Sequence, residues 1–431
     1  KVRFASHRIS ADRSLNLSFK PVRSPAKKAA TGASPDRGES IGLMEPMLIS
    51  ESGGRRSPLA DLALEVAEKS SGFRASLPDA VVRALSDLVR SMNCYYSNLI
   101  EGHDTHPIDI ERALKADYSA DPKKRDLQLE ARAHIDVQKW IDEGGLDGRA
   151  TTSEGLSEVH LRFCSELPDD LLWVTTPDTG ERIKVIPGEF RSRGVTVGRH
   201  VTISPGAVPR FMARFEEAYR RPGKVDSIIS AATAHHRIVW IHAFADGNGR
   251  VVRLMSYAML REALNTGGIW SIARGLARSV DDYKTHLANC DQTRRNDLDG
   301  RGNLSEEALA RFTSYFLTSC LDQIDFMRTL VQQDELRARM LVWTQEEIKA
   351  DRLPAKAGSV VEAILFRGEL PRGDVDTLLG SSERTARRMT SSLIERGVVT
   401  SESSRAPLRL AFPATLASRW MPGLFPDRKE T

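Results

Sequence analysis

The sequence predicts a mainly α-helical protein with a short β-hairpin and a small C-terminal domain of three helices followed by a two-stranded wing. Apolar residues recur at three-and-four spacing through most of residues 58–350, as in "PDAVVRALSDLVR", which is typical of amphipathic helices. Only residues 181–203 combine alternating β-branched residues with glycines, and these predict the hairpin. The pattern changes after "DRLPAKAG" at residues 351–358, which indicates a domain boundary.

Length and composition limit the classes of protein. A chain of 431 residues is long enough for two or three domains, each with its own core. With 40% hydrophobic and 28% charged residues and no run of about 18 apolar residues, we expect a protein without a membrane span. The net charge of +4 is too small to indicate nucleic-acid binding by itself. Cys94, Cys164, Cys290 and Cys320 lack metal-ligand or disulfide spacing, so we expect free thiols and a cytoplasmic location.

Residues 1–55 are rich in Ser, Arg, Lys, Gly and Pro and have no helical or strand period, so we expect a disordered basic segment. Its composition is also that of a transit peptide, but no amphipathic helix accompanies it. Because the chain does not begin with methionine, Met44 and Met47 are alternative starts, and the sequence does not decide whether residues 1–43 belong to the native protein.

The helical part is expected to divide into an N-terminal region (56–145), a core domain (146–300) and connecting helices (301–350). The apolar period predicts helices over residues 58–70, 78–102, 109–116, 126–144, 153–165, 206–219, 224–241, 249–265, 280–289 and 305–333. Residues 351–415 read as three helices, the last capped by Ser381 or Ser382, and then a hairpin. This order is typical of a winged helix and leaves residues 416–431 as a tail.

The stretch "HAFADGNGRVVR", residues 242–253, joins groups that phosphate chemistry needs. His242 has an ordinary pKa near neutrality and could take a proton from an attacking hydroxyl. Gly247, Asn248 and Gly249 form a turn directly before an apolar helix, where backbone N–H groups bind anions. These residue types in this order predict a phosphate site with a base beside it.

The same stretch also offers charged ligands. Asp246 is a hard oxygen ligand suited to Mg²⁺, which needs few protein ligands when phosphates supply the others. Arg250 and Arg253 are three residues apart on the new helix, so both heads can face one phosphate tail. Phe244 reads as an anchor for the loop. A lone histidine or a lone DGNG turn is usually structural, but the combination favours a catalytic site.

These residues resemble the Fic family signature HxFx(D/E)GNGRxxR, which His242, Phe244, Asp246, Gly247–Arg250 and Arg253 all match. Ala243 stands where the family usually has proline, a departure that removes no chemical group. The resemblance covers about residues 90–290 and implies a helical Fic fold with a β-hairpin flap.

The resemblance further implies transfer of AMP from ATP to a protein Ser, Thr or Tyr hydroxyl. His242 would be the base, Asp246 would bind Mg²⁺, and the Gly247–Gly249 loop would hold the phosphates with Arg250 and Arg253. Arginine rather than lysine at position 250 favours AMP transfer over phosphoryl transfer.

Upstream, "CYYSNLIEGHDT" places Ser97 and Glu101 on one helix face, and Gly102 can end that helix in a left-handed conformation. A glutamate at a helix end is ordinarily just exposed. Beside the motif, however, the residues resemble the family's inhibitory helix, (S/T)xxxE(G/N). The resemblance implies that Glu101 pairs with Arg253, takes the place of the ATP γ-phosphate and restrains the enzyme.

Residues 186–200 are similar to the family's flap, and Gly188, Val195 and Val197 are the expected target-binding positions, although a plain surface hairpin is the alternative. Tyr283 reads either as a wall for adenine or as a core residue.

On the expected recognition helix of the winged helix, Arg384, Arg387 and Arg388 could contact DNA or form a solvated face. We therefore expect an adenylyltransferase whose partners are ATP and a protein target, itself included. The alternatives are removal of AMP from a protein, transfer of another group such as UMP or phosphocholine, and a DNA-binding regulator whose core only senses nucleotide.

Overall fold

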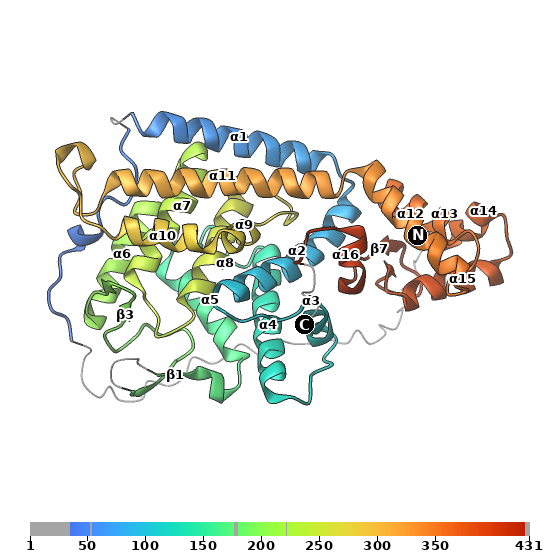
Figure 1. The fold of residues 1–431 in the computed structure, drawn as a ribbon, viewed down its shortest axis with the longest axis horizontal. Helices are drawn as coiled ribbons and strands as arrows, with labels where there is room; N and C mark the ends of the chain where they lie inside the picture. The colour runs from blue at the N-terminus through green and yellow to red at the C-terminus, as the bar shows by residue number, and fades with distance from the viewer. Residues whose placement is uncertain (1–34, 52–53, 176–179, 221, 427–431) are drawn as a thin grey trace, which may run out of the picture. The chain divides into compact units, whose positions relative to one another are not determined.

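The computed structural model describes residues 35–51, 54–175, 180–220 and 222–426. Most of them are helical, which confirms the predicted mainly α fold class (Figure 1). The N-terminal and core helices are α1 (Arg56–Ala75), α2 (Asp79–Ile100), α3 (Pro107–Leu114), α4 (Pro122–Asp142), α5 (Ser153–Ser165), α6 (Val208–Tyr219), α7 (Lys224–Ile241), α8 (Asn248–Leu264), α9 (Ala273–Arg278), α10 (Val280–Cys290), α11 (Glu306–Leu330) and α12 (Gln333–Lys349).

Helix α7 is the centre of the core. Nearly every side chain from Ile228 to Ile241 is buried, because α7 packs against α1, α6, α8 and α11. A helix buried on all sides is apolar all round, and here even its polar residues His235 and Arg237 are fully enclosed. Figure 1 shows α1 and α11 running side by side. The turn that follows α7 is therefore anchored in a fully buried part of the core.

The helix ends are set by local capping. Thr152 accepts a hydrogen bond from Gly155 N (2.9 Å) at the start of α5, and Ser305 accepts one from Ala308 N (3.0 Å) at the start of α11. The helix expected over 305–333 is α11, and α12 follows it after a turn at Val331 and Gln332. Among the helices of the described ranges, none has the length and apolar character needed to cross a bilayer.

Residues 35–51 correct the expectation of disorder over residues 1–55. Met44 and Met47 are buried, Tyr219 Oη donates to the Met47 carbonyl (2.6 Å), and Arg210 pairs with Asp36 (2.8 Å). These partners lie on α6, more than 160 residues along the chain, so local composition could not reveal them. The rest of that expectation, residues 1–34, lies outside the described residues.

The β structure of the core also differs from the single hairpin expected over 181–203. There are two hairpins: β1 (Trp173–Thr175) pairs with β2 (Arg182–Lys184), and β3 (Thr196–Val197) pairs with β4 (His200–Val201). Residues 185–195 connect them as a loop, because Gly188 adopts a left-handed conformation (φ +78°) that ends the extended backbone.

The C-terminal region contains α13 (Ala357–Arg367), β5 (Glu369–Leu370), α14 (Val375–Leu379), α15 (Glu383–Glu395), β6 (Val399–Thr400), β7 (Leu408–Leu410) and α16 (Ala417–Trp420). Its sheet has the order β5-β7-β6, so the expected two-stranded wing gains a third strand. Ser382 caps α15 by accepting a hydrogen bond from Thr385 N. The identification of this region as a winged helix stays a proposal.

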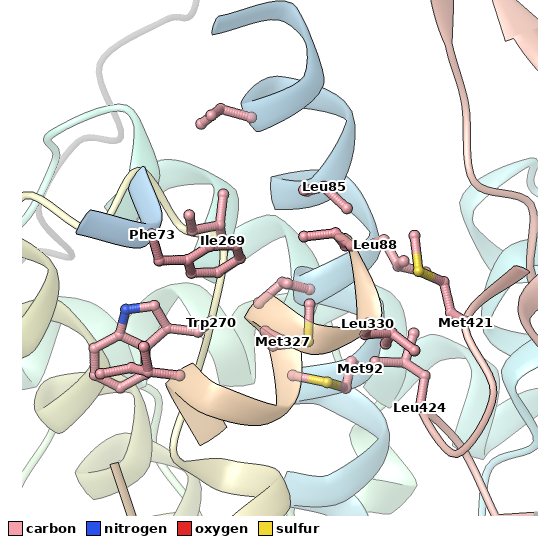
Figure 2. Packing of buried hydrophobic residues seen from close by; sticks show 14 of the residues in the cluster. Phe73, Leu85, Leu88, Met92, Ile269, Trp270, Met327, Leu330, Met421 and Leu424 are labelled. Carbon is pink, nitrogen blue, oxygen red and sulfur yellow. The ribbon is translucent and has the colours of Figure 1, made fainter. Parts of the chain in front are cut away.

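The segment expected as a tail from residue 416 packs into the hydrophobic core as far as Leu424. Figure 2 shows Met421 and Leu424 beside Leu88 and Met92 of α2. In addition, Tyr96 Oη donates to the Leu424 carbonyl (2.9 Å). The end of the described chain therefore braces α2, the helix that carries Glu101 at its C-terminus.

Candidate active site

The turn between α7 and α8 carries the motif. His242 ends α7 in the left-handed region (φ 50°, ψ 61°), and Gly247 adopts φ +76° before α8 begins. The Asn248 side chain closes the turn, because its Oδ1 accepts from Phe244 N (3.0 Å) and its Nδ2 donates to Phe244 O (2.8 Å). The Asn248 side chain is therefore used to shape the loop, and the backbone N–H groups at the start of α8 are the part of the turn suited to bind an anion.

His242 is held as a neutral imidazole. Burial lowers its pKa to about 4, with further lowering from the positive charges of Arg191 and His200, while Glu101 acts in the opposite direction. Within the described chain its Nδ1 is buried without a hydrogen-bond partner. A neutral imidazole at neutral pH is the form that can accept a proton.

Asp246 precedes α8 with its side chain exposed, while its backbone oxygen accepts from His160 Nε2 (3.2 Å). No ion pair to the Asp246 carboxylate is found within the described ranges. One free carboxylate beside a helix start suited to phosphate fits Mg²⁺, which takes one or two carboxylates and completes its shell with phosphates and water. The donor set therefore fits the predicted metal.

The structure brings the predicted inhibitory residues onto Arg253. Arg253 Nη2 donates to Glu101 Oε1 (2.6 Å), its Nε donates to Ser97 Oγ (2.9 Å), and Nη2 also donates to the Ser97 carbonyl (3.1 Å). Gly102 has φ +86°, so the chain leaves α2 directly after Glu101. Residues about 150 positions apart in sequence thus form one cluster.

The Glu101 carboxylate also lies against the start of α8. A Cβ atom placed on Gly249 would be only 2.2 Å from Glu101 Oε1, so glycine is required for this approach. Burial raises the pKa of the Glu101 carboxyl, but Arg253 and Arg250 outweigh it and hold the pKa below its ordinary value. An anionic carboxylate therefore occupies the position that the helix start offers to a phosphate oxygen.

Arg250 pairs with Glu130 rather than with Glu101. It forms an ion pair with the buried Glu130 of α4, and His103 Nδ1 lies 2.7 Å from Glu130 Oε2 and 3.1 Å from Arg250 Nη2. Since a carboxylate only accepts hydrogen bonds, Nδ1 carries a proton, and the pKa of His103 is raised chiefly by this bond. Arg250 and Arg253 are therefore each paired with an acid, rather than both facing one open space.

The expected flap positions have distinct surroundings. Gly188 N donates to His160 Nδ1 (2.8 Å), and a Cβ on Gly188 would be 3.1 Å from the Leu161 Cβ. The Val195 carbonyl accepts from Thr202 Oγ1 (2.7 Å), while Val197 in β3 is exposed. Gly188 is thus held against α5 by its bond to His160, whereas β3 offers an open edge.

Sequence reasoning missed several residues of the site, namely His103, Glu130, His160 and Arg191. His160 stacks on Phe244 with the ring centroids 4.1 Å apart and links α5 to both the flap loop and the motif. Periodicity marks such residues only as helix or loop positions, so no local signal could identify them. Tyr283, considered as a wall for adenine, is buried and bonded to His235 Nε2 (2.7 Å).

The arginines Arg384, Arg387 and Arg388 lie on α15 in the C-terminal region, where all three are exposed. Helix α15 packs against α14 and β6.

Comparison with known proteins identifies residues 156–260 as a match to the family model described as Fic/DOC family. "Protein adenylyltransferase Fic" of Drosophila willistoni is 29% identical over 226 residues, which cover 50% of this chain and 42% of that protein. The protein of the same name from Drosophila grimshawi is 28% identical over 187 residues, covering 43% of this chain and 36% of that protein. The chain thus spans well under half the length of the curated relatives it matches.

Among solved structures, a Fic family protein from Desulfovibrio desulfuricans G20 aligns with a TM-score of 0.48 at 18% identity, covering 84% of this chain and 98% of that one. Fic-1 from C. elegans aligns with a TM-score of 0.44 at 16% identity, covering 64% of this chain and 76% of that one.

Proposed function

This chain is a Fic family protein, and from that premise we propose that it transfers AMP from ATP to a Ser, Thr or Tyr hydroxyl of a target protein. The single observation that carries the proposal is the turn 242–250, where a neutral buried histidine, an exposed carboxylate and a helix start lie together. The target includes the protein itself.

In this reaction the hydroxyl oxygen forms a bond to the α-phosphorus of ATP, and the bond from that phosphorus to the leaving pyrophosphate oxygen breaks. His242 takes the hydroxyl proton, and its low pKa keeps it in the accepting form at neutral pH. The N–H groups at the start of α8 hold phosphate oxygens, and Arg253 binds the end of the phosphate chain. Mg²⁺ held by Asp246 would neutralise phosphate charge.

The proposal includes restraint by Glu101. Because its carboxylate bonds to Arg253 and lies against Gly249, ATP cannot place a γ-phosphate on Arg253 until Glu101 moves. Arg250, paired with Glu130, would turn to the nucleotide only if that pair opened, so we assign it the role of shaping the site around the phosphates. We also propose a cytoplasmic location, because the four cysteines are buried free thiols and such thiols persist in a reducing compartment.

The test uses ATP labelled at the α-phosphate with wild type, Glu101→Gly and Glu101→Gly/His242→Ala. We expect label on protein to be strongest in Glu101→Gly and absent from the double variant. Transfer of label from the γ-phosphate of ATP, or of a nucleotide other than AMP, would show that the transferred group is not AMP. Release of AMP from a modified protein by wild type, faster than transfer, would make removal of AMP the main reaction.

A second function, DNA binding by the C-terminal region, is favoured by one observation. Arg384 and Arg388 lie four residues apart on α15, both exposed, and neither has an acidic partner within 4 Å in the described chain. Arg387 instead pairs with Glu383 (2.5 Å). Two free arginines on one helix face suit phosphate contacts. This binding would accompany the transferase rather than replace it.

A further inference from the structure

Arg191, in the loop between the two hairpins, makes an unusual set of contacts with the catalytic turn. Its guanidinium Nε donates to the His242 carbonyl (2.7 Å), and its backbone N–H donates to the Ala243 carbonyl (2.9 Å). Its Nη2 donates to the Ile203 carbonyl and its Nη1 to the Arg193 carbonyl, at 2.7 and 2.8 Å. One residue therefore joins the end of α7 to both sides of the flap.

This guanidinium is buried without a carboxylate. Arg191 is only 3% exposed, and no Asp or Glu oxygen lies within 4 Å of it in the described ranges. Burial lowers its pKa to about 10, so it stays charged at neutral pH. A buried charge with only carbonyl partners is costly, although the C-terminus of α7 compensates in part because a helix C-terminus attracts cations. Such a cation indicates a role beyond packing.

His242 needs outside support for its conformation. A non-glycine residue at φ 50°, ψ 61° is strained, and such residues persist where the surrounding structure holds them. The His242 N–H bonds back to the Ile238 carbonyl (3.1 Å), and Arg191 takes the two carbonyls that follow, those of His242 and Ala243. Together these bonds define the direction in which the imidazole leaves the backbone.

We propose that Arg191 is the positioning residue of the catalytic base: it locks the left-handed turn at His242 and fixes that turn to the flap that would present the target hydroxyl. The inference rests on the proposed function, because it assumes that His242 is the base. It predicts that Arg191 acts on the chemical step and leaves ATP binding alone, since no phosphate-binding group contacts its guanidinium in the described chain.

The charges that face His242 agree with this role. Arg191 and His200 are the positive groups and Glu101 is the negative one, and burial is the largest influence on the imidazole. Removing the Arg191 charge therefore raises the pKa of His242, whereas replacing Arg191 by lysine retains a charge but not the three-carbonyl geometry.

The experiment compares Arg191→Met, Arg191→Lys and the control Arg220→Met, each in the full chain with Glu101→Gly. Arg220 follows the end of α6, outside the flap, and its side chain is 69% exposed, so Arg220→Met leaves the turn intact. We would measure kcat and KM for ATP across pH, and titrate the His242 imidazole by NMR in histidine-labelled protein. The His242 resonance is assigned by its loss in His242→Ala, and thermal unfolding establishes that each variant is folded.

For Arg191→Met we expect kcat to fall about 100-fold, KM to stay within about twofold, and the imidazole to titrate at higher pH. Arg191→Lys should lower kcat while His242 titrates as in the parent, and Arg220→Met should change neither. A folded Arg191→Met with unchanged kcat, a loss confined to KM, or an unshifted His242 titration would overturn the proposal.

Two further outcomes keep the proposals separate. If Arg191→Met does not fold, Arg191→Lys decides, and an unchanged kcat in that variant refutes the positioning role. If even Glu101→Gly transfers no AMP, the proposed function fails, while the NMR titration still tests whether Arg191 controls His242.

Discussion

Arg253 Nη2 and Glu101 Oε1 lie 2.6 Å apart, and the same arginine donates to the side chain and the carbonyl of Ser97. Arg253 is almost fully buried, whereas the Glu101 side chain is 31% exposed. Glu101 can therefore leave toward solvent without opening the core, while Arg253 stays held by Ser97. This asymmetry makes the glutamate the movable partner of the pair.

The pair predicts that charge on Glu101, more than its size, restrains the enzyme. Glu101→Gln keeps the shape but removes the ion pair, so transfer of α-labelled AMP should rise by roughly 5- to 150-fold, the range of typical coupling energies. Glu166→Gln is the matched control, because Glu166 also follows the last turn of a helix but forms no ion pair within the described residues. Equal rates for wild type and Glu101→Gln would contradict the electrostatic restraint.

His103 predicts a pH-dependent contribution to stability. Its folded pKa is raised by Glu130, so the stabilisation is fully present below the unfolded pKa of about 6.5 and is lost as pH rises through the folded pKa. Because His103 is 43% exposed, the effect should be small. Urea unfolding of wild type and His103→Ala should therefore differ more at pH 6 than at pH 9. A difference that grows with pH would be inconsistent with this bridge.

His134 predicts a loss of stability in acid, because its folded pKa is lowered rather than raised as in His103. It is fully buried, both ring nitrogens lack partners in the described chain, and burial lowers its pKa to about 3. Protonation is therefore disfavoured in the folded state, and stability is lost as pH falls below the unfolded pKa. His134→Leu should lessen the loss of unfolding free energy between pH 6.5 and 5. The control is His286→Leu, because His286 is only half-buried and burial lowers its pKa less than that of His134. This variant should therefore change the loss of unfolding free energy between pH 6.5 and 5 less than His134→Leu does.

The ordered segment before α1 predicts a measurable share of the stability. Met47 is 2% exposed, whereas its neighbour Leu48 is 43% exposed. Met47→Ala should lower the free energy of unfolding by about 2–5 kcal/mol, and Leu48→Ala should lower it by less than about 1 kcal/mol. Chemical denaturation measures both. Equal effects would mean that residues 35–51 do not pack in solution as described.

The exposed face of α15 predicts salt-dependent DNA binding. Arg384→Ala/Arg388→Ala should weaken binding to duplex DNA and reduce the slope of log K against log salt by about 2, one per phosphate contact. Arg367→Ala, an exposed arginine at the end of α13, is the control. Fluorescence anisotropy at several salt concentrations measures the slope. Binding that is absent in wild type, or unaltered by the double change, would remove DNA from the partners.

The helical architecture and the motif could be predicted from the sequence because both depend on residues that are close together along the chain. Apolar spacing marked α2, α7 and α8 within a few residues, and the turn 242–250 carries the proposed base, the carboxylate and the glycines within nine residues. The link from Glu101 to Arg253 could be expected only from the family resemblance, since the two residues are 152 positions apart and nothing in the local sequence indicates that they meet.

What the sequence determined by itself was the fold class, the residues proposed as base and metal ligand, and the helix end that carries Glu101. Only the tertiary structure decided which partner each arginine takes: Arg253 takes Glu101, Arg250 takes Glu130, and Arg191 takes the backbone of the catalytic turn. The reason is physical. Backbone periodicity depends on neighbouring residues, whereas a buried charge pairs with whatever the packing of distant helices brings within hydrogen-bond distance.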